Sequence, residues 1–154
     1  MIEQKISIIV GLWFEGFFNE KEVVAWADKS ILEMDDDIYD PLIELSLKGP
    51  EQCVKKPSYE FPSRKEFSFR ERFAIRLTKL DLANHGDVRK FVTWVVGNAM
   101  GEDRDTPEVQ FGDQLYDYLD YGEIDPVVHF KRNVHEYIES SMTVVNLYLG
   151  QVNT

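Results

Sequence analysis

The sequence predicts an all-α fold, a single compact bundle of six to seven helices that spans residues 1–154 as one domain. Apolar side chains recur at intervals of three and four residues along most of the chain, which is the spacing of one helix face. No segment alternates apolar and polar residues long enough to require a strand, and residues 66–70 come nearest. With 44% hydrophobic and 29% charged side chains, 154 residues can bury a core without disulfides or metals.

The first third of the chain predicts three helices and a long connection. Residues 1–17 carry an apolar face, and Asn19 followed by Glu22 predicts a capping box that begins a second helix at 20–34. A third helix is expected at 40–47, capped by the aspartates at 35–37 and ended by Gly49. Residues 50–66 contain three prolines, which predict a connection with at most one short helical turn, near 51–55.

The rest of the chain predicts four further helices. The first spans 67–84 and ends at His85, where the helix dipole favours a histidine in the last turn. Asp87 is expected to cap the next helix, which runs to Gly101. Residues 106 and 107, a threonine and a proline, predict the start of a helix at 106–121. A last helix is expected at 125–149, with Met142 among its inward residues.

The charge and cysteine content restrict the class of partner. The net charge of −11 argues against nucleic acid and anionic membranes as direct ligands and favours a basic protein, although acidity also serves solubility alone. Cys53 is the only cysteine, which excludes an intrachain disulfide and is compatible with the cytoplasm. The apolar run at 6–18 is interrupted by Glu15 and is too short to span a bilayer. We therefore expect a cytoplasmic protein.

Residue patterns that would indicate catalysis are missing from the sequence. His129 and His135 are six residues apart, a poor spacing for two zinc ligands on one helix. Asp125 and His129 have the spacing of an ordinary contact on a helix surface. Cys53 lies in no nucleophile motif, and no phosphate-binding loop occurs. The sequence therefore predicts a protein that is not an enzyme and that has no cofactor or metal site.

Residues 102–125 form a dense acidic stretch, with nine carboxylates and a single base, Arg104. On a helix with about 100° per residue, one face of this stretch carries Asp113, Tyr116, Asp117 and Asp120. The opposite, core-facing side carries Phe111, Leu115, Tyr118 and Leu119. Like charges one turn apart destabilise a helix by roughly 0.2–0.5 kcal/mol per pair, which a basic partner would relieve. The plain alternative is a solvated helix face without a partner.

A second acidic block lies at residues 33–44, where six acids and a tyrosine occur without a base. The residues predicted to bind the partner in the two blocks are Asp35, Asp36, Asp37, Tyr39, Asp40, Asp113, Tyr116, Asp117, Asp120, Tyr121, Glu123 and Asp125. Residues 64–90 hold eight of the chain's 17 bases against four acids. These bases either neutralise the acidic blocks inside the fold or form a separate basic face, and the sequence leaves both possibilities open.

The segment from Gly16 to Ala27 reads Gly-Phe-Phe-Asn-Glu-Lys-Glu-Val-Val-Ala-Trp-Ala. With this segment, the short, acidic and helical chain resembles the immunity proteins of bacterial polymorphic toxin and contact-dependent growth inhibition systems. The resemblance extends over most of the chain as composition, and no residue roles follow from it. It implies a cytoplasmic inhibitor of one cognate basic toxin domain, with a nuclease expected and an RNase favoured, through mimicry of nucleic-acid charge.

Two functions of other classes stay open beside this one. The first is an acidic helical adaptor or nucleic-acid mimic that acts on a host partner, which a neighbouring gene for a large secreted protein would argue against. The second is a small hydrolase with a metal bound by carboxylates. The hydrolase would retain stoichiometric metal after extensive dialysis, and the inhibitor would not.

Overall fold

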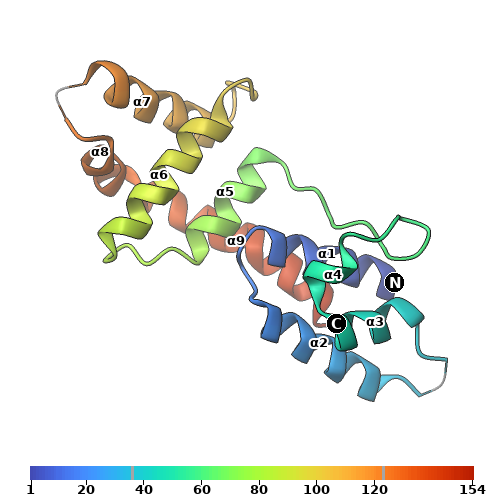
Figure 1. Ribbon diagram of the computed structural model, residues 1–154. Helices are drawn as coiled ribbons and strands as arrows, with labels where there is room; N and C mark the ends of the chain where they lie inside the picture. The colour runs from blue at the N-terminus through green and yellow to red at the C-terminus, as the bar shows by residue number, and fades with distance from the viewer. Residues whose placement is uncertain (36, 123) are drawn as a thin grey trace. The chain divides into compact units, whose positions relative to one another are not determined.

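The computed structural model describes residues 1–35, 37–122 and 124–154, and leaves the side chain of Tyr121 undescribed. The described residues form nine helices and no strand, so the all-α class is confirmed (Figure 1). The chain divides into two compact units, Met1–Glu66 with Tyr148–Thr154 (unit 1) and Phe67–Leu147 (unit 2). The expected single domain stays a prediction, and each unit is described by itself.

Unit 1 contains α1 (Ile2–Phe14), α2 (Glu20–Glu33), α3 (Asp40–Lys48), α4 (Pro50–Cys53) and the end of α9. The predicted capping box that begins α2 is confirmed, because the Glu22 N–H donates to Asn19 Oδ1 at 2.8 Å and the Asn19 N–H donates to Glu22 Oε1 at 3.1 Å. Ser46 of α3 donates to Asp28 of α2, which ties these two helices together. The core of the unit includes Ile6, Ile9, Leu12, Val23, Ala27, Leu42 and Leu45.

The start of α3 differs from the expectation. Aspartates at 35–37 were expected to cap it, but the residue before the helix is Tyr39, whose side chain makes no capping hydrogen bond. Asp36 lies outside the described residues. Gly49 ends α3 as predicted, with φ of +80°, and α4 begins at the next residue. A side chain at Gly49 would be strained at this φ, so the tight connection between α3 and α4 depends on glycine.

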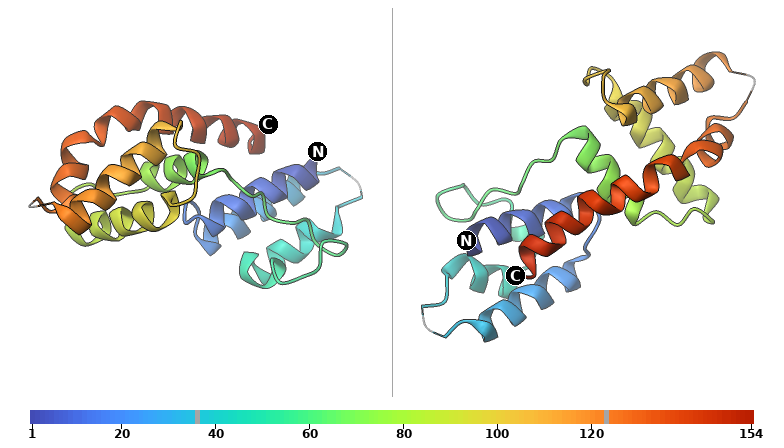
Figure 2. Two further views of the ribbon diagram at one scale, coloured as in Figure 1. Left: turned by 90° about the horizontal axis from the view of Figure 1, so that it is seen from above. Right: turned by 180° about the vertical axis from the view of Figure 1, so that it is seen from behind.

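Unit 2 contains α5 (Phe69–Thr78), α6 (His85–Ala99), α7 (Pro107–Tyr121), α8 (Pro126–Asn133) and the part of α9 (His135–Val152) up to Leu147 (Figure 2). Aromatic rings dominate its core. The ring of Phe73, which is fully buried, lies 5.4 Å from Phe91, 6.4 Å from Phe111 and 5.6 Å from Tyr137 between ring centroids. This cluster joins α5, α6, α7 and α9, so the position of α7 depends on the aromatic core.

The boundary between α5 and α6 corrects the prediction for His85. The helix expected to reach residue 84 ends at Thr78, and α6 begins at His85. Asn84 is the capping residue, because its Oδ1 accepts from the Asp87 N–H at 3.1 Å. His85 is therefore in the first turn of a helix and not in a last turn, where the dipole would favour its charge.

The predicted last helix is divided in two at Val134. The Asn133 side chain donates to the His129 carbonyl at 2.9 Å, and the Tyr137 N–H donates three residues back to Val134, which tightens this turn. This division and the short α4 explain why the described residues hold nine helices where six to seven were expected. Met142, expected to point inward, is 49% exposed.

The close approach of α6 and α7 requires a glycine. A Cβ at Gly112 of α7 would lie 2.5 Å from the Cβ of Ala99 in α6. A Cβ at Gly97, in the same helix as Ala99, would meet open space. We expect Gly112→Ala to lower the free energy of unfolding by about 1–3 kcal/mol because the two helices must separate. Gly97→Ala is the matched control and should raise it by about 0.5–1 kcal/mol, since alanine favours the helix. Urea denaturation of both variants measures the opposite signs, and equal effects would contradict the packing of α6 on α7.

Candidate partner-binding site

The helix α7 carries the predicted acidic and tyrosine face. Pro107 occupies its first turn as predicted, although the Thr106 side chain makes no capping hydrogen bond. Phe111 and Leu115 are buried at 1% and 0% exposure, which confirms the inward side for these two residues. Leu119 was expected on the same side but is 58% exposed. The inward stripe of α7 therefore becomes exposed toward the end of the helix.

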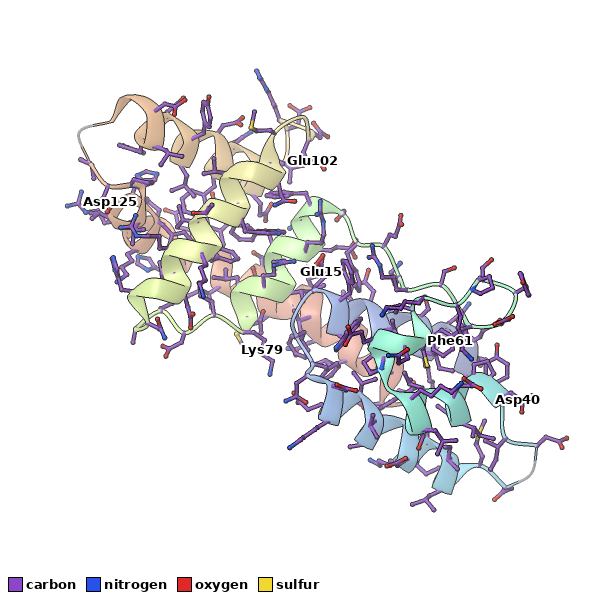
Figure 3. All side chains as sticks on the ribbon, in the orientation of Figure 1. Glu15, Asp40, Phe61, Lys79, Glu102 and Asp125 are labelled. Atoms are coloured by element: carbon purple, nitrogen blue, oxygen red, sulfur yellow. The ribbon has the colours of Figure 1, made fainter. Side chains whose placement is uncertain are left out.

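A hollow of about 710 Å³ lies beside this face. It is lined by Ala99, Met100, Gly101, Glu102, Arg104, Asp113, Tyr116 and Asp117. Gly101, with φ of +82°, turns the chain after α6, and Glu102 closes the turn with a hydrogen bond from its N–H to the Ala99 carbonyl at 3.1 Å. In Figure 3, Glu102 lies near the start of α7 and Asp125 lies beyond its end. The turn thus brings the acids at 102–105 next to α7.

The charges in the hollow are mostly negative. Its lining includes three carboxylates, of Glu102, Asp113 and Asp117, and one guanidinium, of Arg104. Asp113 is half-buried, whereas Asp117 and Asp120 are exposed. Within the part of the chain that the structure describes, no ion pair or hydrogen bond engages the carboxylates of Asp113, Asp117 or Asp120. These three aspartates therefore keep their charge available for a cation from outside the chain.

Other acids of the same stretch are neutralised within unit 2 by bases of the segment 64–90. The ion pairs are Arg72–Glu102 at 3.7 Å, Arg70–Glu108 at 3.3 Å and Arg89–Asp125 at 2.7 Å. Glu108 is 4% exposed, so its carboxylate is a buried charge that needs its partner. For these three arginines, the first of the two possibilities in the sequence is realised, namely neutralisation inside the fold.

The prediction that Asp125 binds the partner stays a prediction, and its contacts within the chain also give it a structural role. It caps α8, because Oδ1 accepts from the Val127 N–H at 2.9 Å while Oδ2 pairs with Arg89. The hydrogen bond from Arg89 lowers the pKa of Asp125, and the hydrogen bond from Val127 lowers it further. The predicted spacing contact with His129 is not made by these atoms, since His129 bonds to Gln114 and Asn133.

We expect Asp125→Ala to cost about 1 kcal/mol of stability at neutral pH, chiefly through the lost cap. Because the pKa of Asp125 is lowered on folding, its contribution is present above its ordinary value of 3.8 and is lost as pH falls through the lowered pKa. Urea denaturation at a series of pH values should therefore show wild type and variant converging in acid. Asp125→Asn keeps a capping oxygen and loses only the charge pair, which contributes little at this exposed site. Its free energy of unfolding should therefore lie between those of wild type and Asp125→Ala.

The acidic block at 35–40 belongs to unit 1, whereas α7 belongs to unit 2. Asp35, Asp37 and Asp40 are exposed. Tyr39, predicted as an anchor, donates its hydroxyl to Glu3 Oε1 at 3.2 Å, and burial followed by this hydrogen bond raises the pKa of its phenol. Tyr39 thus links the start of α3 to α1.

Three predicted binding residues are not fully described. Asp36 and Glu123 lie outside the described residues, and the side chain of Tyr121 is not described. Tyr121 is the last residue of α7 by its backbone. The predicted set that the structure brings together on one helix is therefore Asp113, Tyr116, Asp117 and Asp120, of which the first three line the hollow.

Sequence reasoning missed part of the hollow's lining. Met100, 64% exposed, and Arg104 were not among the expected binding residues. In the sequence, Arg104 stands out only as the single base of its stretch. Gly101 was the available signal, because a glycine with positive φ after a helix reverses the chain toward the next element.

The segment that carries the resemblance to immunity proteins forms the turn from α1 into α2. Gly16 has φ of +84°, and the Phe17 and Phe18 rings meet edge to face at 4.8 Å between centroids. Val23 and Ala27 are fully buried. This segment therefore builds unit 1 and contributes nothing to the hollow of unit 2.

Comparisons of the chain with protein-family models, with curated proteins and with solved structures find no match. Among the described residues, no group of three or more His, Cys, Asp or Glu side chains is placed to hold a metal ion. No described helix combines the length and hydropathy needed to cross a membrane.

Proposed function

We propose that this protein is a cytoplasmic immunity protein that binds and neutralises a basic toxin domain through α7. A nuclease domain is the expected partner, with an RNase favoured, because the surface of a nuclease that binds nucleic acid carries positive charge. The single observation that carries the proposal is the hollow beside α7, where aspartates without an internal partner surround an exposed tyrosine. The resemblance of the chain to immunity proteins supports the same class.

The electrostatic argument concerns the three aspartates of α7. Asp113 and Asp117 are one turn apart, so their mutual repulsion destabilises the free protein slightly. A lysine or arginine of the partner that enters the hollow would remove this repulsion and form charge-assisted hydrogen bonds. Charge of this kind also speeds association, by roughly 10- to 1000-fold at low ionic strength. A basic partner therefore gains both affinity and rate at this face.

Tyr116 supplies the second element of an interface. It is 36% exposed and lines the hollow between the two aspartates. Tyrosine is enriched among residues that dominate binding energy, because it buries a large rigid ring and loses little conformational entropy. The volume of about 710 Å³ admits a basic side chain together with part of the loop that carries it.

The experiment that tests this function starts from capture of the partner. The protein is immobilised and incubated at low salt with an extract of the bacterium that produces it, and bound proteins are eluted in high salt and identified by mass spectrometry. The recovered protein is then expressed in a bacterial host, alone and together with this chain. The proposal expects a basic protein that arrests growth alone and is harmless when both are expressed.

Two outcomes contradict the proposal. A partner that does not arrest growth would favour the hypothesis of an acidic adaptor over that of an immunity protein. A partner that elutes only with detergent and not with salt would contradict the electrostatic interface. Nuclease activity of the isolated partner, measured on RNA and on DNA, decides the chemistry of the toxin.

A further inference from the structure

His129 belongs to α8 and lies at its contact with α7, the helix that carries the acidic and tyrosine face. Its ring is half-buried and lies 4.3 Å from the Tyr118 ring and 5.9 Å from the Phe111 ring, between centroids. Both of those residues belong to α7. Because the imidazole contacts two rings of the neighbouring helix, a change in its charge acts directly on the packing of α7 against α8.

The hydrogen-bond partners assign the protonation state of the ring. Asn133 Nδ2 donates to the His129 backbone carbonyl at 2.9 Å, which fixes the amide with its NH₂ group toward the imidazole. The same Nδ2 lies 3.4 Å from Nδ1 of His129, so Nδ1 must accept. The ring proton is therefore on Nε2, which lies 3.3 Å from Oε1 of Gln114 and donates to it. Both nitrogens are satisfied only in the neutral ring.

We propose that His129 is a pH-sensitive pin that stabilises the packing of α7 on α8 while its ring is neutral and weakens that packing when the ring is protonated. A proton on Nδ1 faces the NH₂ group of Asn133, which cannot turn without losing its bond to the backbone carbonyl. The charged ring must also stay against the rings of Phe111 and Tyr118, where it is only partly open to water. Protonation therefore favours an open state in which α7 has moved off α8 and the imidazole is hydrated.

The groups around His129 determine the direction in which its pKa shifts. Among the described side chains of α7, the titratable group at the ring is the Tyr118 phenol, and from α8 itself Arg132 adds a positive charge. From α6, His85 and Arg89 act on Asp125 at the start of α8. Burial lowers the pKa of His129, and the charge of Arg132 lowers it further.

From α9, Tyr137 stacks on Phe111 at 4.8 Å, with the carboxylates of Glu108 and Glu136 near its phenol. These two acids therefore act on Tyr137, which the Phe111 ring separates from the imidazole.

The sign of the pH effect follows from the lowered pKa. The open state binds a proton with the ordinary pKa of 6.5, and the closed state binds it only at lower pH. The closed state is thus at full strength above pH 6.5, weakens as pH falls toward the lowered pKa, and stays at a constant lower stability below it. Each unit between the two pKa values corresponds to a tenfold loss in the closing equilibrium.

Two NMR measurements on the full chain test the pin together. Long-range ¹H–¹⁵N spectra give the tautomer and the pKa of His129, and amide hydrogen exchange gives the protection factors of α7 from about pH 7.5 to about pH 5. The expected result is a proton on Nε2, and a loss of α7 protection that approaches ten raised to the difference between 6.5 and the measured pKa as the pH falls well below that pKa. Amides of α2, in unit 1, serve as the internal reference and should show no such loss.

Three variants make the test specific to the pin. His129→Gln keeps a neutral amide and should remove the pH dependence of α7, whereas His135→Gln, at an exposed histidine of the same unit, should leave it unchanged. Asn133→Asp offers a carboxylate to a protonated Nδ1 and should raise the pKa of His129 above its wild-type value. If His129→Gln does not fold, the tautomer of wild-type His129 and the pH dependence of wild-type α7 protection are sufficient to test the proposal.

A proton on Nδ1, α7 protection that does not change with pH, or a His129→Gln protein with the wild-type pH dependence overturns the proposal. The test needs no partner, so its failure is independent of the function proposed for α7.

Discussion

Replacing Asp117 and Asp120 together by lysine is expected to weaken binding of the captured partner at least a hundredfold. The double variant changes the charge of the face by four and places two cations opposite a basic surface. Losing a charge pair at an interface costs roughly 2–5 kcal/mol, and like-charge contacts add to this cost. Surface plasmon resonance at several salt concentrations should show a slower association at low salt and a flatter dependence on ionic strength.

The control for this prediction changes the same amount of charge on another helix of the unit. Glu136 and Glu139 are exposed residues of α9, and Glu136→Lys plus Glu139→Lys also shifts the net charge by four. We expect this control to slow association modestly through the net charge alone and to leave the dissociation rate unchanged. If both double variants lose affinity equally, the effect belongs to net charge and the face on α7 is not the binding site.

Phe73→Ala is expected to have the largest effect on stability, a loss of about 3–5 kcal/mol from unit 2. The Phe73 ring is fully buried and contacts rings of α6, α7 and α9, so its removal leaves a cavity that several helices border. Trp94, which stacks on Phe69 and Phe91 at 5.8 and 5.9 Å between centroids, is the fluorescence probe of this core. Denaturation in a background with Trp13 and Trp26 replaced by phenylalanine isolates its signal.

Two comparisons test whether the loss of stability comes from a cavity in the core of unit 2. Phe73→Leu retains most of the apolar volume and should cost clearly less than Phe73→Ala, because the residual cavity is smaller. In a second background that keeps Trp26 alone, the same Phe73→Ala substitution reports on unit 1. A Phe73→Ala protein whose Trp94 transition is as stable as wild type would contradict the aromatic core that positions α7.

The elements that could be predicted from the sequence are those set by local chemistry. The capping box of Asn19 and Glu22 and the glycine at position 49 each act within four residues, so their patterns identify helix ends directly. The start of α6 was mistaken because Asn84 and Asp87 are both good capping residues, and a pattern does not rank them. The break at Val134 was missed because apolar periodicity continues through it, while tertiary packing and the Asn133 side chain define the turn.

The candidate site shows the same division between local and tertiary information. Helical periodicity correctly placed Asp117 and Asp120 away from the core. The contacts of Asp125 could not be predicted in this way, because its partner Arg89 is 36 residues away in the sequence and their pairing depends on how α6 packs on α8. Arg104 lines the hollow because of the path of the loop after α6, which is also a tertiary feature that the sequence does not show. The distribution of charge in the sequence therefore predicts an acidic face. Which of its charges are paired within the chain depends on the tertiary fold.

The most direct test of a binding face on α7 is an NMR titration of the isotope-labelled protein with the captured partner. Amide signals report each residue of both units separately, so one experiment locates the contact. We expect the largest changes at residues 99–105 and 113–120, with Tyr116 and Asp117 among them, and smaller changes in α1 and α3. Changes concentrated at residues 33–44 of unit 1, with α7 unaffected, would contradict the account and assign the partner to the other acidic block.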